Sequence, residues 1–280
     1  MNNIFVRHAK RSGPSGRKIA ETLREYLPLH TIGVGRTIDP VAEIIINWGG
    51  GYILPNDSVV FNDPWSVRTS SDKIAAFTKL EDNDIQIPYW SFTENWRHGF
   101  PQTWEGTGVD IKFPVLARKK HGKRGKGIRY CESYLAAMQY LDTHDFISEF
   151  IEKKYEFRVH VAFNEVVKTS QKVFDPTKGK RYQNIIWNHQ KGFVFKNPKD
   201  DVKPELLERV NNFGIASINA MGLHFGAVDI IIDNDEVIWV LETNTAPGLI
   251  NSTAIAYAKK FAEVINRNNQ STLAEIANNI

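Results

Sequence analysis

The chain has 280 residues, 42% of them hydrophobic and 24% charged, with a formal net charge of +3. That length supports a substantial core, and sixteen Phe with seven Trp exclude disorder over most of the chain. The small net charge excludes a strong whole-protein attraction to nucleic acid or to a membrane surface.

The only cysteine is Cys131, so neither an internal disulfide nor a cysteine-rich zinc site is predicted. The first residues lack the apolar segment and cleavage pattern of a signal peptide, and no apolar run is long enough to span a bilayer. We therefore expect a cytoplasmic protein with no membrane partner.

A small α/β unit is predicted at residues 1–68. It begins with a strand at 3–7, continues with apolar residues at helical spacing over 17–27, and contains a buried strand at 43–47 that ends in glycines. The Gly/Ser-rich loop between the first strand and the helix is expected to be a simple turn rather than a nucleotide loop.

Residues 69–280 are predicted to form a larger unit, in which an extended stretch at 85–92 and an irregular one at 94–110 follow the first helix. Its helices are predicted from Ser70 to Leu80 and at 133–141, 204–221 and 253–266, and the last few residues of the chain are expected to fray. Its strands are predicted at 114–118, 128–131, 145–151, 156–162, 167–174, 226–233 and 237–244.

The last two strands form a hairpin that carries acidic side chains. If they pair around the turn at Asn234-Asp235, Asp229 lies near Glu242, and Asn244 projects to the same face as Glu242. Carboxylate and amide oxygens of this kind suit Mg²⁺, which would also neutralise the two acids. The alternative is two ordinary acids on an exposed face, but the apolar run around Asp229 weighs against it.

The string ETNTAPG at 242–248 resembles the metal-binding signature of the ATP-grasp superfamily. In form it is closest to D-alanine–D-alanine ligases and ribosomal-protein glutamate ligases. The resemblance covers roughly residues 70–255 and implies an α/β (α+β) fold, with a small α/β domain preceding the ATP-grasp module. By the same resemblance Asp229, Glu242 and Asn244 bind Mg²⁺ or Mn²⁺ at the ATP phosphates.

A glycine-rich loop follows the strand that ends at Arg118. Gly122, Gly125 and Gly127 would let backbone N–H groups approach anionic oxygens. Family members have a cation at the position of Arg118, most often Lys, and Lys119 or Lys120 is an alternative for this role. The basic stretch KKHGKRGKGIR could also be a solvated loop, a nucleic-acid patch or a site for an acidic second substrate.

Further positions match the family pattern between these two motifs. Lys73 resembles the lysine that reaches the ATP phosphates, and Glu149, Phe150 and Ile151 resemble the hinge that binds adenine. Glu156 matches the acid that holds the ribose, and Arg158 the cation that faces the phosphates; the alternative for both is a cross-strand ion pair. Residues 181–184 resemble an Arg and Asn of glutamate ligases.

Taken together, the resemblance implies a Mg·ATP-dependent ligase that activates a carboxylate as an acyl-phosphate and joins it to an amine. It divides the larger unit into a glycine-loop subdomain at about 110–150 and a metal-binding subdomain at about 151–280. Arg118 and Arg158 would be the catalytic cations. Three alternatives remain open: a kinase, a ligase with a protein, peptide or nucleic-acid acceptor, and a nucleotide sensor. Homo-oligomers are equally open.

Overall fold

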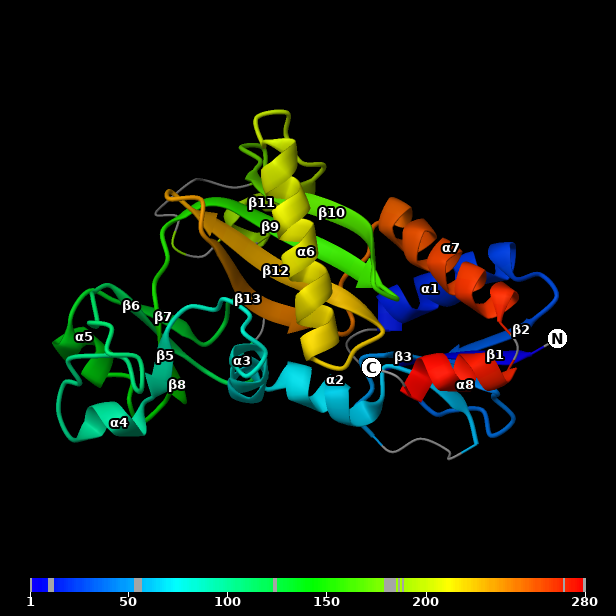
Figure 1. The fold of residues 1–280 in the computed structure, drawn as a ribbon, viewed down its shortest axis with the longest axis horizontal. Coiled ribbons are helices and arrows are strands. Elements are labelled where there is room, and N and C mark those ends of the chain that lie inside the picture. Colours follow the sequence, from blue (N-terminus) through cyan, green and yellow to red (C-terminus); the bar gives the residue numbers. More distant parts are fainter. Residues whose placement is uncertain are drawn as a thin grey trace.

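The computed structural model describes residues 2–9, 13–52, 57–122, 125–178, 185, 187, 189–268 and 270–278. Three β-sheets follow one another along the long axis of the molecule, each with helices against it (Figure 1). This arrangement confirms the predicted mixed α/β class. Within the described residues, no helix is long and apolar enough to cross a membrane.

The N-terminal sheet is parallel and has the strand order β2-β1-β3-β4. Its strands are β1 (Asn3–His8), β2 (Thr31–Gly35), β3 (Ile44–Trp48) and β4 (Val59–Phe61). Helix α1 (Gly13–Tyr26) packs beside α7 (Asn251–Arg267), and α8 (Gln270–Asn278) lies near β4. The C-terminal helices lie beside the N-terminal sheet in Figure 1, and their side chains share a hydrophobic core with it.

The sheet of β5 to β8, at the left end of the molecule in Figure 1, is antiparallel and has the strand order β5-β8-β6-β7. Its strands are β5 (Trp90–Phe92), β6 (Val115–Arg118), β7 (Ile128–Cys131) and β8 (Phe146–Glu149). Helices α4 (Glu94–Arg97) and α5 (Tyr134–Met138) lie beside it. On one face of this sheet, Val115, Ala117 and Ile147 pack with Trp96 and Trp104.

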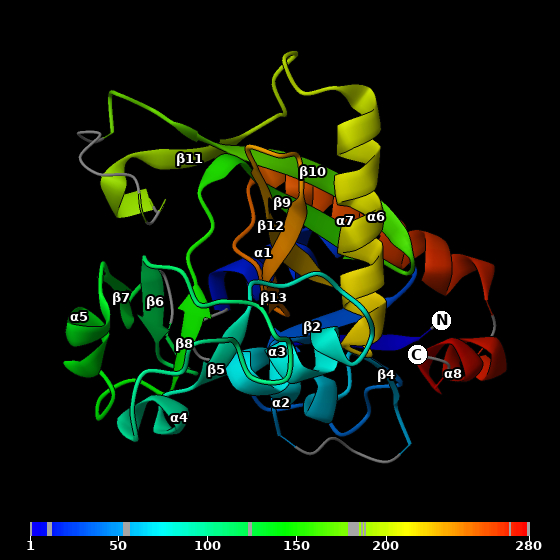
Figure 2. The ribbon, with the colours of Figure 1, turned by 60° about the vertical axis from the view of Figure 1, so that its left-hand side comes forward.

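The C-terminal sheet is antiparallel and has the strand order β11-β10-β9-β12-β13. Its strands are β9 (Lys153–Ala162), β10 (Glu165–Phe174), β11 (Phe193–Lys196), β12 (Phe225–Asp233) and β13 (Ile238–Asn244), and a short 3₁₀ helix η2 (His189–Lys191) precedes β11. Helix α6 (Pro204–Ala220) covers one face (Figure 2). The predicted hairpin is thus confirmed as β12–β13.

Two helices stand where the sequence predicts one from Ser70. Helix α2 (Pro64–Ser71) begins with Pro64 at its first turn, and Asp63 accepts hydrogen bonds from two of its backbone N–H groups. Asp72 is extended and caps α3 (Lys73–Glu81) in the same way. The predicted helix is therefore confirmed as α3, but it begins at Lys73 rather than Ser70, because Asp72 ends α2 and caps α3; α2 itself was not predicted.

Two other predictions need correction. Residues 94–97, predicted to be irregular, form α4, and a helix that was not predicted, α8, follows α7. The predicted domain boundary at residue 68 falls inside α2, and the division of the chain into domains stays a prediction.

Candidate active site

Two carboxylates face each other across the β12–β13 hairpin. Asp229 is the register partner of Glu242, and its side chain is buried, with 6% of the residue exposed. Asn244 donates a hydrogen bond from Nδ2 to Glu242 Oε1 over 3.2 Å. The predicted proximity of these three side chains is confirmed, and a register shift between Asp229 and Ile230 brings Asp229 opposite Glu242.

Arg158 completes this group from the neighbouring strand β9, where it is the register partner of Asp229. Its Nε donates to Asp229 Oδ1 over 2.6 Å and its Nη2 to Oδ2 over 2.7 Å. Burial alone would raise the pKa of Asp229, but the charge and hydrogen bonds of Arg158 outweigh it and hold that pKa below its usual range. Burial would likewise lower the pKa of Arg158, and Asp229 raises it instead.

Glu156 is buried between two lysines. Lys153 Nζ donates to its Oε2 over 2.7 Å, and Lys172 on β10 donates to Oε1. Both Glu156 and Arg158 thus form cross-strand ion pairs, with Lys172 and Asp229 as their partners, and their assignment to the ribose and the phosphates stays a prediction. The sequence analysis missed both lysines, whose contact with Glu156 depends on the strand geometry of β9 and on its pairing with β10.

Lys73 connects the hairpin to the glycine-rich loop. It is the first residue of α3, and its Nζ lies 3.3 Å from Glu242 Oε2 and donates to the Gly122 carbonyl over 2.8 Å. Its backbone N–H also donates to the Lys120 carbonyl over 3.0 Å. One side chain thus joins the acidic group and the loop, which come from different sheets.

The loop itself requires glycine at specific positions. A Cβ on Gly122 would lie 2.5 Å from the backbone oxygen of Lys126, closer than real side chains approach. Gly125 and Gly127 have φ of +74° and +82°, a region that favours glycine. The loop therefore folds tightly at the end of β6.

Arg118 is buried at the end of β6, with 5% of the residue exposed. Its guanidinium carbon lies 5.2 Å from the ring centres of both Phe77 and Phe146. Burial lowers the pKa of Arg118 to about 10, against the opposing effect of the Glu242 charge, so the side chain stays cationic at neutral pH. Its Nε has no hydrogen-bond partner within the described residues.

The predicted hinge, residues 149–151, lies between β8 and β9. Within the described part of the chain, Glu149 Oε2 and the hydroxyl of Ser148 are buried and without partners. Burial raises the pKa of Glu149. Phe150 packs edge-to-face against Tyr130 at 5.2 Å between ring centres. Ser148 begins the stretch SEFI at 148–151, whose resemblance to the adenine hinge the sequence shows.

The buried polar atoms without hydrogen-bond partners indicate whether this site suits a nucleotide and a metal ion. Buried polar groups are normally hydrogen-bonded, so Arg118 Nε, Ser148 Oγ and Glu149 Oε2 have donor or acceptor capacity that a polar ligand could use. No cluster of three or more His, Cys, Asp and Glu side chains occurs among the described residues. Two carboxylates with one amide still fit Mg²⁺, which commonly takes one or two carboxylates together with phosphate oxygens.

Two further expectations concern the loop neighbourhood. Lys119 follows Arg118 in the β6–β7 ladder, and consecutive strand residues point to opposite faces of the sheet. The Lys119 side chain therefore lies on the other face from Arg118. Residues 181–184, predicted to include an Arg and an Asn of the site, lie outside the described residues.

Comparison with known families supports the resemblance. The sequence model of a family described as the RimK-like ATP-grasp domain matches residues 70–265. No protein with a curated description matches the chain.

Solved structures share the fold at low sequence identity. A D-alanine–D-alanine ligase from Bacillus anthracis is 14% identical with a TM-score of 0.63, over 99% of this chain and 96% of that one. A RimK domain protein from Sphaerobacter thermophilus is 14% identical with a TM-score of 0.62, over 92% and 98%. The ATP-grasp ligase PsnB, solved with a minimal precursor, is 12% identical with a TM-score of 0.63, over 95% and 99%.

Proposed function

This chain belongs to the family of RimK-like ATP-grasp domains, and we propose that it is a ligase that joins a carboxylate to an amine. The reaction would use Mg·ATP, proceed through an acyl-phosphate and release ADP and phosphate. The observation that carries the proposal is the contact of Lys73 with both Glu242 and Gly122, which links the acidic hairpin to the glycine-rich loop.

Asp229, Glu242 and Asn244 are the residues that would hold Mg²⁺ or Mn²⁺. A bound divalent cation would neutralise negative charge on the phosphates. In the described structure Arg158 occupies both Asp229 oxygens and Lys73 pairs with Glu242, so protein cations already balance these acids. The same cations would be available to phosphate oxygens once a metal ion took the carboxylates.

The remaining predicted residues are assigned to the nucleotide. Lys73, Arg118 and Lys120, with the backbone of Gly122, Gly125 and Gly127, would contact the phosphates. Glu149, Phe150 and Ile151 would bind adenine, and the unpartnered Glu149 oxygen supports this assignment because adenine carries an amino donor. Glu156 would accept hydrogen bonds from the ribose hydroxyls.

The chain's own groups would act mainly through charge and position. The substrate carboxylate attacks the γ-phosphate in line, and Arg118 and Arg158 stabilise the negative charge that develops on the transferred group. The amine then attacks the acyl-phosphate carbonyl, an amide forms and phosphate leaves. The glycine-rich loop would exclude water, which would otherwise hydrolyse the intermediate.

Hydroxylamine trapping tests this proposal without knowledge of the amine. Wild-type protein is incubated with Mg·ATP, hydroxylamine and a panel of amino acids, small carboxylates and acidic peptides, and both ADP and hydroxamate are measured. We expect a hydroxamate with wild type and none with Glu242→Gln. Glu236→Gln is the matched control, because Glu236 is an acid at the turn of the same hairpin, paired with Lys154 and Lys203.

The outcomes separate the alternatives. ADP release that depends on a substrate but gives no hydroxamate would indicate a kinase and contradict the proposal. Hydroxamate formation by Glu242→Gln at the wild-type rate would contradict the metal assignment. Transfer of a labelled amino acid to a protein or peptide would place the acceptor among macromolecules.

A further inference from the structure

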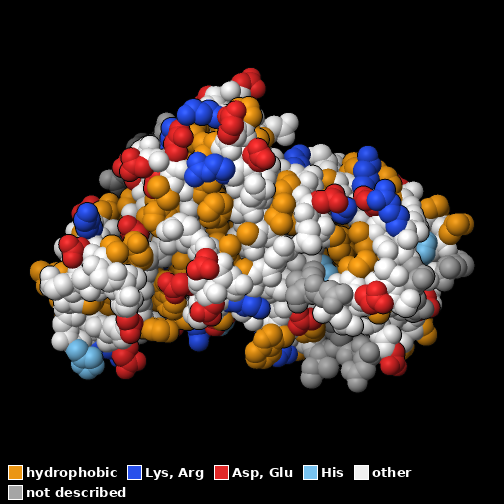
Figure 3. Space-filling model, viewed as in Figure 1, with side chains coloured by type: hydrophobic (Ala, Val, Ile, Leu, Met, Phe, Trp, Pro, Cys, Tyr) orange, Lys and Arg blue, Asp and Glu red, His pale blue; other side chains and the backbone are white. Residues whose placement is uncertain are grey.

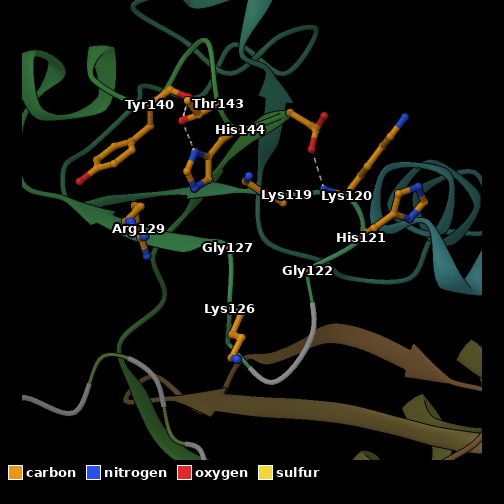
Figure 4. Close-up of a pocket in the computed structure, with 11 residues that line it drawn as sticks. Lys119, Lys120, His121, Gly122, Lys126, Gly127, Arg129, Tyr140, Thr143 and His144 are labelled. Atoms are coloured by element: carbon orange, nitrogen blue, oxygen red, sulfur yellow. Dashed lines mark hydrogen bonds between the residues drawn. The ribbon is translucent and has the colours of Figure 1, made fainter. Parts of the chain in front are cut away.

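A basic pocket lies beside the glycine-rich loop, in the region between β6, β7 and the segment that follows α5 (Figure 4). Its volume is about 740 Å³, within the size range of small-molecule sites. We call it the loop pocket. It is lined by Lys119, Lys120, His121, Gly122, Lys126, Gly127, Arg129, Tyr140, Thr143, His144 and Asp145.

Strand register places Arg129 and Lys119, which line this pocket, on the face of the β5–β8 sheet opposite to Arg118. Arg129 is the register partner of Ala117, whereas Arg118 is the partner of Ile128. Directly paired residues share a face and consecutive residues alternate, so Arg129 and Arg118 project to opposite faces. Lys119 lies on the Arg129 face, since its N–H bonds to Gly127 and continues the same ladder. The Lys119 and Arg129 side of the loop pocket therefore faces away from Arg118, while Lys120, Gly122 and Gly127 belong both to the pocket lining and to the loop proposed to contact the ATP phosphates.

Within the described part of the chain, the cations of the loop pocket lack acidic partners. Lys119, Lys120, Lys126 and Arg129 form no ion pair with any carboxylate of the described residues. The lining includes one acid, Asp145, and its Oδ2 accepts a hydrogen bond from the Lys120 backbone. Four cations against one carboxylate leave a local excess of about three positive charges.

His144 adds a second unsatisfied group. Only 8% of this residue is exposed, and its Nδ1 lies 2.9 Å from the Thr143 hydroxyl. Its Nε2 is buried and has no hydrogen-bond partner in the described part of the chain. Burial, together with the charges of Lys119 and Arg129, lowers the pKa of His144. A bound anion would act in the opposite direction and raise the pKa of His144.

We propose that the loop pocket binds a small anion that carries two linked phosphate groups. Charge density favours phosphates over carboxylates, because pyrophosphate brings about three negative charges into one site, whereas carboxylates bring one each. Nucleic acid is disfavoured, because the Tyr140 ring already packs against His144 and Arg129 and offers less surface for base stacking. On the one face drawn in Figure 3, acidic and basic side chains intermingle.

Occupation of the loop pocket would restrain the glycine-rich loop. The carbonyls of Lys120 and Gly122, whose residues line the pocket, accept the two hydrogen bonds from Lys73. A ligand in the pocket would therefore hold the loop in the position in which it contacts Lys73. This coupling does not require the proposed ligase activity.

Imidazole NMR of the full chain tests the proposal. Protein labelled with ¹⁵N-histidine is titrated with inorganic pyrophosphate in EDTA, without nucleotide, and the His144 signal is assigned by its absence in His144→Gln. We expect a saturable shift of this signal in wild type. Lys119→Gln/Arg129→Gln should need about tenfold more pyrophosphate, since each lost cation removes a charge-assisted contact. Lys259→Gln, which removes an exposed cation on α7, should behave as wild type.

Three results would overturn the proposal. The first is a His144 signal that does not move to saturation with pyrophosphate. The second is an equal response in wild type and in Lys119→Gln/Arg129→Gln. The third is saturation by a short single-stranded oligonucleotide or by oligoglutamate at a lower concentration than pyrophosphate, which would assign the pocket to a macromolecule. None of these readouts depends on ATP turnover, so failure here and failure of the proposed function are distinguishable.

Discussion

Replacing Asp229 by Asn should destabilise the protein at neutral pH. The substitution removes the carboxylate that accepts two hydrogen bonds from Arg158, at 2.6 and 2.7 Å, and leaves a buried guanidinium without its main partner. Removing one member of a buried ion pair costs about 3–5 kcal/mol. The Glu242 charge also raises the pKa of Arg158, so it would still stabilise the guanidinium in Asp229→Asn. We therefore expect a loss in the free energy of unfolding at the lower end of this range, about 3 kcal/mol.

Urea unfolding followed by tryptophan fluorescence and ellipticity measures this cost. Asp235→Asn, at an exposed position of the same hairpin turn, is the control and should change the free energy of unfolding by less than about 0.5 kcal/mol. Asp229→Asn/Arg158→Met should regain part of the loss, because the unpaired charge is gone. A cost below about 1 kcal/mol for Asp229→Asn would refute the reasoning, since the pair would then contribute no more than an exposed one.

The same pair predicts the direction of a pH effect. The pKa of Asp229 is lower in the folded than in the unfolded state. The stability that its carboxylate contributes is therefore complete above the unfolded pKa of about 3.9 and is lost as pH falls from there toward the folded pKa. The difference between wild type and Asp229→Asn should therefore be constant from pH 7 to pH 5 and shrink below pH 4. If the difference in the free energy of unfolding between the two proteins increased as the pH was lowered, the lowered pKa of Asp229 would be contradicted.

Three other changes test separate features. Gly122→Ala should raise the KM for ATP several-fold with little change in unfolding, because its Cβ would meet the Lys126 oxygen at 2.5 Å; an unchanged KM would contradict the loop assignment. Arg118→Lys should weaken ATP binding by about tenfold despite the retained charge, measured by calorimetry, because lysine cannot use a planar group between two rings. Burial lowers the pKa of His160 to about 3 and of His224 to about 4, so neutral forms are favoured on folding. The free energy of unfolding should thus fall by up to about 1.4 kcal/mol per pH unit for each histidine as pH drops from 6.5 toward 4, and a flat profile would contradict it.

Local patterns made the hairpin predictable. The apolar residues on both sides of Asn234-Asp235 predicted the pairing of the two strands and so placed Asp229 near Glu242. The register shift between Asp229 and Ile230, which sets Asp229 directly opposite Glu242, had no signal in the sequence. The string at 242–248 then identified the family, whose sequence model matches most of the chain. Both signals lie within a few residues along the chain.

Contacts between sheets were not predictable in this way. Lys73 meets Glu242 across 169 positions of sequence only because α3 lies beside the C-terminal sheet. The edge strands β2, β4 and β11 were also missed, since each has five residues or fewer and β2 includes two glycines, which weakens the strand pattern. Their pairing partners, rather than their own propensities, make them strands.

Arg118 illustrates how the structure explains a departure from the family pattern. The resemblance to the ATP-grasp superfamily implies lysine at this position, and a lysine ammonium is a strongly hydrated point charge that is costly to bury. In this chain Phe77 and Phe146 place aromatic rings on the guanidinium, and a planar, weakly hydrated cation tolerates that environment. Its Nε, which has no partner among the described residues, retains a donor for an anionic group. The two phenylalanines and the arginine therefore form one unit, and the substitution of arginine for lysine is consistent with the same phosphate-binding role.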